Sequence, residues 1–221
     1  MYVDVHAHMY AYKGSTNIRV VSCSVDLDSI KKNVLLRDKY YIGLGIYPHE
    51  ELGNALDLIR EYNPDVIGEI GLDYYYPADR DEQIKKFESQ LELAGQLGVP
   101  VSVHSRRAEK DVMDVLSSYN LIVNIHCFTG KLKIAKIGFD RGYFFSVPPS
   151  VVRSSHFKSL VKLAPKELIL TESDAPYLGK PDDVKTSVNV IASEWGLSSS
   201  EAEEIIFNNS KRYLGKAFNR L

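Results

Sequence analysis

Residues 65–104 read DVIGEIGLDYYYPADRDEQIKKFESQLELAGQLGVPVSVH and contain one complete strand–helix–strand unit. The apolar runs DVIGEI (65–70) and PVSVH (100–104) are typical of buried strands. Between them, DEQIKKFESQLELAGQLG (81–98) repeats apolar residues at the three- and four-residue spacing of an amphipathic helix. A helix that connects two such strands predicts that the strands run parallel.

The same alternation continues along the whole chain of 221 residues. Further β-rich runs occur at 2–6, 18–24, 41–47, 121–126, 142–147 and 167–172. Further helical patterns occur at 27–40, 50–62, 108–119, 131–139 and 156–164. Eight such units predict a single-domain α/β fold over residues 1–221, a (β/α)8 barrel of the TIM type. An open doubly wound sheet is the alternative, although it more often has five to seven strands.

Two segments depart from the regular pattern. The first connection, MYAYKGSTN (9–17), is too short and polar for a full helix, so we expect an irregular barrel there. Two helices are expected to close the chain, and the second, SSSEAEEIIFNNSKRYLGKAF (198–218), begins with serines and early glutamates that suit a helix N-terminus.

Composition limits the function classes. Hydrophobic residues make up 44% of the chain and the net charge is −2, so bulk charge does not favour non-specific nucleic-acid binding. Cys23 and Cys127 lie in apolar runs, which predicts buried thiols in a reducing compartment. We find neither a signal-peptide pattern nor an apolar stretch that could span a bilayer. These observations predict a cytoplasmic protein without membrane contact or an obligate protein partner.

Histidines recur at one end of the predicted strands. The chain has six of them, and five end or follow a strand: His6, His8, His49, His104 and His126. The C-terminal ends of barrel strands converge on one rim, where active sites form. A lone histidine there is most simply a core or rim residue, but several at equivalent positions favour a metal site. The sixth, His156, is expected on the solvated face of a helix.

Two carboxylates join this pattern. Glu69 lies in the fourth strand between two glycines, which leave room for close approach, and Asp174 follows the eighth strand. A carboxylate in an apolar strand is costly unless it is paired or bound to a metal. The alternatives are a structural ion pair for Glu69 and a turn cap for Asp174. Glu172 is expected to support the site or the structure, and Asp73 to be a turn or rim residue.

Six motifs in order carry a family resemblance. They are H-x-H (6–8), GxxPH (45–49), GEIGLDYY (68–75), PVxVHxR (100–106), IHCFTG (125–130) and ESDAPYL (172–178). Together they resemble the TatD family of metal-dependent hydrolases, which belongs to the amidohydrolase superfamily of (β/α)8 barrels. The resemblance extends roughly over residues 2 to 215.

The resemblance implies a site with two divalent metal ions, either zinc, manganese or magnesium. The implied ligands are His6, His8 and Asp174 for the first ion, His104 and His126 for the second, and Glu69 as the bridge between both. It also implies a deoxyribonuclease that acts on DNA or another phosphoester. One departure concerns Tyr47, which stands where family members commonly have a histidine that faces the substrate. In addition, the loop after ESDAPYL is short, and Lys180 is its only basic residue.

The chemistry expected of such a site assigns further roles. A hydroxide that bridges two cations is the expected nucleophile, with Glu69 and Asp174 as catalytic residues and Asp174 as proton acceptor. Arg106 is expected to hold a phosphate oxygen, and His49 to orient the substrate or protonate the leaving group. A surface arginine and a rim histidine are the alternatives for these two residues.

Three other functions are alternatives to the deoxyribonuclease. A different hydrolase on the same metal core, such as an aminoacyl-tRNA deacylase, lactonase or amidase, is the main alternative. A catalytically silent binding module is disfavoured because all six ligand positions are intact. A phosphoesterase of the PHP type also begins with H-x-H, but it needs further ligands in another order.

Overall fold

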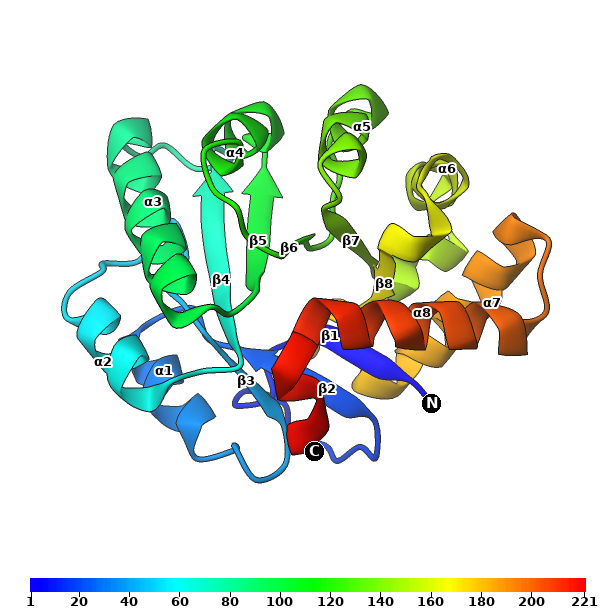
Figure 1. The fold of residues 1–221 in the computed structure, drawn as a ribbon, viewed down its shortest axis with the longest axis horizontal. Coiled ribbons are helices and arrows are strands. Elements are labelled where there is room, and N and C mark those ends of the chain that lie inside the picture. The colour runs from blue at the N-terminus through cyan, green and yellow to red at the C-terminus, as the bar shows by residue number, and fades with distance from the viewer.

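Eight parallel strands form the centre of the molecule (Figure 1). The computed structural model describes residues 1–221, and each strand pairs with the next one along the chain. The strands are β1 (Val3–Ala7), β2 (Arg19–Cys23), β3 (Tyr41–Leu44), β4 (Val66–Asp73), β5 (Val101–Arg106), β6 (Val123–Ile125), β7 (Phe144–Val147) and β8 (Ile169–Thr171). The predicted (β/α)8 barrel is therefore confirmed.

The barrel closes between its first strand and the segment that follows its last strand. The backbone N–H of Asp174 donates to His6 O at 3.0 Å, and the N–H of His8 donates to Ala175 O at 2.7 Å. The barrel is therefore nearly closed, although β1 and β8 are the two ends of the sheet order. These bonds also bring the histidines of β1 next to the turn that contains Asp174.

Helices surround the strands on the outside of the barrel (Figure 1). The α-helices are α1 (Leu27–Val34), α2 (Ala55–Tyr62), α3 (Arg80–Leu97), α4 (Glu109–Leu116), α5 (Leu132–Asp140), α6 (Ser155–Leu163), α7 (Val184–Trp195) and α8 (Ser199–Leu214). The short 3-10 helices are η1 (Pro149–Val152), η2 (Lys166–Leu168), η3 (Pro181–Asp183) and η4 (Gly215–Arg220). As predicted, no helix connects β1 to β2.

Four helices, α1, α2, α4 and α8, are shorter than predicted. The segment 27–40 is helical only to Val34, and the segment 50–62 is helical only from Ala55. In the first case Leu35 points into solvent, so the apolar spacing beyond Val34 does not mark a buried face. The predicted start of α8 is confirmed, because Ser198 and Glu201 form a reciprocal capping box there, but the α-helix ends at Leu214 and not at residue 218.

The core consists of 51 buried apolar residues from the strands and the inner faces of the helices. The C-terminal segment covers the end of the barrel at which the strands begin. There Tyr41 donates its hydroxyl hydrogen to Phe218 O at 2.8 Å, and Arg220 binds Asp65 with an Nη2–Oδ2 distance of 2.6 Å. The helix η4 therefore covers one end of the barrel. The polar side chains lie at the opposite rim, where the strands end.

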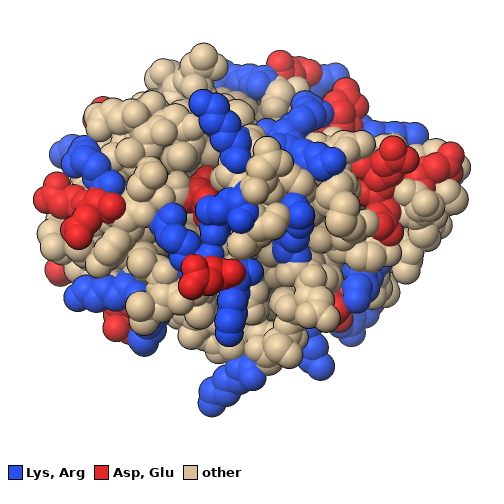
Figure 2. All heavy atoms as spheres, turned by 60° about the horizontal axis from the view of Figure 1, so that its bottom comes forward, with Lys and Arg blue, Asp and Glu red and all other residues tan.

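Charged side chains are distributed unevenly over the surface. On the side where Figure 1 places the C-terminus, Lys and Arg gather across the middle of the face with few Asp and Glu among them (Figure 2). This face is therefore locally basic (Figure 2), although the net charge of the whole chain is −2. None of the helices combines the length and the apolar character that crossing a bilayer requires.

Candidate metal centre

The six predicted ligands converge at the rim where the strands end. They are His6 in β1, His8 just after it, Glu69 in β4, His104 in β5, His126 after β6 and Asp174 after β8. A pocket of about 350 Å³ opens onto them, and five of the six line it. The lining also includes Tyr47, Arg106 and Tyr177.

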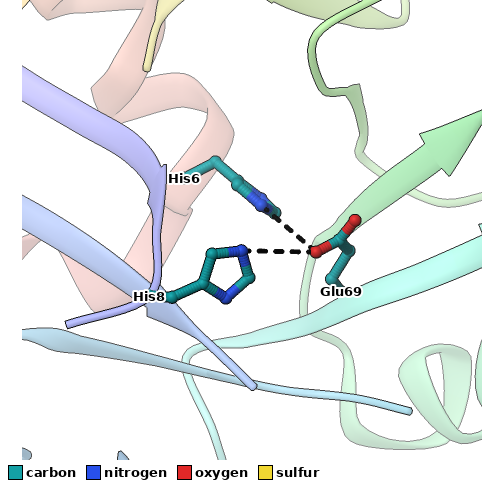
Figure 3. A group of neighbouring side chains, drawn as sticks. All are labelled: His6, His8 and Glu69. Carbon is teal, nitrogen blue, oxygen red and sulfur yellow. Dashed lines mark ion pairs between the residues drawn. The ribbon is translucent and has the colours of Figure 1, made fainter. Parts of the chain in front are cut away.

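The first donor group consists of His6, His8 and Glu69, whose nitrogens and carboxylate oxygen lie within 4.8 Å of one another (Figure 3). Both Nε2 atoms lie 3.5 Å from Glu69 Oε2. Asp174 lies beside this group, with its Oδ1 3.3 Å from His8 Nε2 and 3.9 Å from His6 Nε2. Two imidazoles and two carboxylates therefore face one small volume.

The second donor group uses the other oxygen of the same glutamate. Glu69 Oε1 lies 2.9 Å from His104 Nδ1 and 3.0 Å from His126 Nε2. These three residues also lie within 4.8 Å of one another. Each oxygen of Glu69 thus faces its own pair of histidines, and this arrangement suits a carboxylate that bridges two cations.

Two glycines let β4 lie close to β5 beside Glu69. A Cβ atom on Gly71 would lie 2.1 Å from His104 O, and one on Gly68 would lie 2.8 Å from Ser102 Cβ. Gly71 also has a φ of +140°, which side chains rarely permit. The space that the sequence predicted around Glu69 is therefore used to bring the two strands together.

Most of the histidines are fixed by a contact at their second ring nitrogen. His8 Nδ1 donates to Cys23 O at 2.9 Å, which leaves Nε2 with the free lone pair. His6 Nδ1 lies 2.8 Å from Ser102 Oγ. His126 Nδ1 lies 3.6 Å from Glu172 Oε2, which is too far for a hydrogen bond, whereas His104 Nε2 lies 3.1 Å from Tyr47 Oη. Such outer partners orient a histidine before a metal binds.

Asp174 has a strained backbone. Its φ of +49° lies in the left-handed region, which costs a residue with a side chain on the order of 1–2 kcal/mol. The backbone N–H groups of Tyr177 and Leu178 donate to Asp174 O and hold this turn. Such strain persists where the surroundings enforce it, and it is frequent at functional sites.

The titration of the metal-free centre reflects the mutual proximity of its groups. Burial by itself raises the pKa of Glu69, but His126 and His104 outweigh burial and hold that pKa well below its ordinary value. Burial lowers the pKa of His126, but Glu69 and Glu172 raise it well above its ordinary value. By contrast, burial and the neighbouring His126 lower the pKa of His6. The centre therefore stabilises positive charge, which protons supply in the absence of cations.

Comparison with known proteins agrees with this geometry. A family model described as TatD related DNase matches residues 3–215. The chain belongs to this family. It is 34% identical to deoxyribonuclease TATDN3 of Homo sapiens over 182 residues, which cover 76% of this chain and 66% of that protein. It is 28% identical to a metal-dependent hydrolase of Methanocaldococcus jannaschii, with 96% of each chain covered. A solved TatD homolog of Escherichia coli K12 superposes with a TM-score of 0.88 at 20% identity, covering 96% of this chain and 97% of that chain.

The two predicted substrate residues of this TatD chain occupy different places. Arg106 lines the pocket, and its Nε and Nη2 contact Asp73 Oδ2 at 2.9 and 2.7 Å. His49 is half-buried outside that lining, with Nε2 3.9 Å from the same Asp73 oxygen. Arg106 therefore lies at the pocket, whereas the imidazole of His49 lies near Asp73 outside the pocket lining.

Sequence reasoning missed the contacts of Asp73 and Tyr47. Asp73 was expected at a turn or rim, but it is fully buried at the end of β4. Tyr47 donates to Asp73 Oδ2 at 2.5 Å, and its hydroxyl oxygen lies 3.1 Å from His104 Nε2. One signal could have found Asp73: it stands four residues after Glu69, and alternation places both on one face of a strand.

Two further expectations are wrong. His156 is half-buried rather than solvated, because its Nε2 donates to Phe128 O at 3.1 Å. The buried thiol is confirmed for Cys23, but Cys127 is only partly buried. The chain turns away from the barrel directly after β6, with a φ of +44° at Cys127. Cys127 therefore packs against the core with only part of its side chain buried.

Proposed function

We propose that this TatD protein is a divalent-metal-dependent hydrolase that cleaves phosphodiester bonds in DNA at a centre with two cations. The observation that carries the proposal is the shared glutamate, whose two oxygens face two separate pairs of histidines. Family membership and the barrel with its polar rim support the same reaction class.

The spacing of the donor atoms fits metal ions. Ligands at about 2.1 Å from one ion stand about 3.0 Å apart in octahedral and about 3.4 Å apart in tetrahedral geometry. Most of the distances between donor atoms around Glu69 are 2.9 to 3.5 Å. In addition, the buried Nε2 of His6 has no hydrogen-bond partner, as expected for a lone pair reserved for a cation.

These distances support one assignment of the ligand sets. In this proposal the first cation takes His6, His8 and Asp174, the second takes His104 and His126, and Glu69 contacts both. Four imidazoles favour Zn²⁺ or Mn²⁺ over Mg²⁺, which prefers oxygen ligands.

The residues of the chain then divide the work of hydrolysis. Divalent cations bound at the centre supply Lewis-acid polarisation of the phosphoryl group and a water of lowered pKa. Asp174 faces the histidines through Oδ1, and its Oδ2 takes the proton of the attacking water and passes it to the leaving oxygen. Arg106 contacts Asp73 through Nε and Nη2, and its Nη1 donates to a phosphate oxygen.

Exposed aromatic side chains beside the pocket support a nucleic-acid substrate. Tyr177 lines the pocket with 66% of its surface exposed, and its ring centroid lies 5.3 Å from that of His8. Near Arg106, the exposed Tyr75 and Tyr76 rings lie 4.5 and 5.1 Å from the guanidinium carbon. Nucleobases stack on such rings, while a basic group contacts the phosphate between them.

Hydrolysis of a labelled oligonucleotide by purified protein tests the proposal. Metal-depleted protein is expected to be inactive and to recover with Mn²⁺, Zn²⁺ or Mg²⁺. The Glu69→Gln variant is expected to stay folded and to remain inactive with all three ions. The Glu92→Gln variant is the matched control, since Glu92 is exposed on α3. Full activity of the metal-depleted protein in excess chelator would contradict the proposal.

The same preparation separates the alternative substrates. Aminoacyl-tRNA and a lactone, assayed in parallel, are expected to react more slowly than the oligonucleotide. The substrate role of His49 stays a prediction, as does the cytoplasmic location.

A further inference from the structure

One histidine of the centre is oriented differently from the other three. His6, His8 and His126 each turn Nε2 toward Glu69. His104 turns Nδ1 toward it instead, at 2.9 Å from Glu69 Oε1 and 3.2 Å from His126 Nε2. The second donor group therefore depends on a histidine whose outward nitrogen is Nε2.

The outward Nε2 of His104 meets two oxygen atoms. It lies 3.1 Å from Tyr47 Oη and 3.3 Å from Asp73 Oδ2. Asp73 is fully buried, and Tyr47 and His104 are partly buried. The hydrogen-bond partners of this nitrogen therefore lie within the protein.

Counting hydrogens assigns the proton. Tyr47 has a single hydroxyl hydrogen, and it donates this hydrogen to Asp73 Oδ2 at 2.5 Å. The carboxylate of Asp73 is paired with Arg106 and can only accept. Both oxygens that face Nε2 are therefore acceptors, so Nε2 must carry the hydrogen. In the neutral imidazole that binds a cation, Nδ1 then keeps its lone pair and points it at the donor group that contains Glu69 Oε1.

The acceptor pair is itself held in place. Asp73 Oδ1 accepts a hydrogen bond from the backbone N–H of Tyr75 at 2.9 Å. The side chain of Gln83 clamps the backbone of Asp73, accepting from its N–H at 2.9 Å and donating to its carbonyl at 3.0 Å. The carboxylate therefore has little freedom to turn away from His104.

We propose that Tyr47 and Asp73 are positioning residues that fix His104 as an Nδ1 ligand of the second cation. The inference rests on the proposed two-cation function and deepens it. It explains why Tyr47 can stand where family members commonly have histidine: its hydroxyl links an aspartate to a metal-binding imidazole. Carboxylate and hydroxyl partners of this kind change metal affinity about 10- to 100-fold when they are removed.

The choice of nitrogen can be observed directly. Protein with ¹⁵N-labelled histidine is loaded with two equivalents of ¹¹³Cd²⁺, and the ¹¹³Cd–¹⁵N couplings are measured by NMR. We expect a coupling to Nδ1 of His104 and couplings to Nε2 of the other three histidines. A coupling to Nε2 of His104, or no coupling to that ring, would overturn the proposal.

Matched variants test the role of the hydroxyl. Tyr47→Phe is expected to weaken binding of the second Zn²⁺ equivalent about 10- to 100-fold and to leave the first unchanged. Tyr74→Phe is the control, because Tyr74 also donates to an aspartate, Asp111, at 3.0 Å, but its hydroxyl has no contact with the donor groups. Equal affinities for both equivalents in Tyr47→Phe and wild type would overturn the positioning role.

Failure of the inference and failure of the proposed function give different results. If wild-type protein binds two Zn²⁺ and cleaves the oligonucleotide while Tyr47→Phe keeps both affinities, only the positioning role is wrong. If wild-type protein binds no second Zn²⁺, both proposals are wrong.

Discussion

Replacing Gly71 by alanine perturbs the centre through the backbone without substituting any of the proposed ligands. The new Cβ would lie 2.1 Å from His104 O, whereas real Cβ atoms essentially never approach closer than 3.0 Å. The two strands must therefore move apart by about 0.9 Å between Glu69 and His104, and a misplacement of about 1 Å can cost on the order of 10²-fold in rate. Because Gly71 has a φ of +140°, the side chain also adds backbone strain, which costs on the order of 1–3 kcal/mol.

The assay measures Zn²⁺ affinity, the rate of oligonucleotide cleavage and thermal unfolding on the same preparation. A fold stable by about 5–15 kcal/mol should tolerate this cost and remain folded. We expect weaker binding of the second cation and a kcat about 100-fold lower. Gly98→Ala is the matched control, since its φ of +67° imposes strain but its Cβ meets nothing within 4 Å. Wild-type kcat and metal content in folded Gly71→Ala would refute the reasoning.

Three other perturbations give separate tests. Arg106→Lys keeps the charge but loses the planar fork, so kcat/KM for the oligonucleotide should fall about 10-fold, with Arg107→Lys as the exposed control. In chelator, the folded protein raises the pKa of His126 and lowers the pKa of Glu69, so this pair should stabilise the fold fully between pH 4.5 and 6.5. The stabilisation should be lost as the pH rises above that window, where His126 loses its proton, and as the pH falls below it, where Glu69 gains one. Thermal melting temperatures that do not change from pH 4 to 9 would contradict this prediction. Ser198→Ala should cost about 1 kcal/mol in chemical denaturation without changing kcat, because it removes only the cap of α8.

The fold could be predicted from local patterns in the sequence. Strand and helix periods alternate, so the barrel and the order of its strands could be predicted from residues 65–104 and their repetition. The ends of the helices were less predictable, because apolar spacing alone does not show which side chains are buried and which are exposed to solvent. Leu35 has the spacing of a core residue and yet is 83% exposed.

The convergence of the six proposed ligands could be predicted because the position of a residue along a parallel strand indicates which end of the barrel it lies near. Each lies within a strand or at most three residues after one, and the ends of parallel strands meet at one rim. The partners of the ligands were not predictable in the same way. The hydrogen bond from Tyr47 to Asp73 joins residues 26 positions apart, and their approach depends on how β3 and β4 are staggered. The local spacing of apolar residues along the chain does not indicate the distance between Tyr47 and Asp73.

An anomalous difference map from crystals of the protein soaked in Mn²⁺ would show whether the barrel rim binds two cations. We expect two peaks at the rim, one against Glu69 Oε2 between His6 and His8 and the other against Oε1 between His104 and His126. A single peak, or strong peaks only elsewhere on the molecule, would contradict a centre in which one glutamate joins two cations.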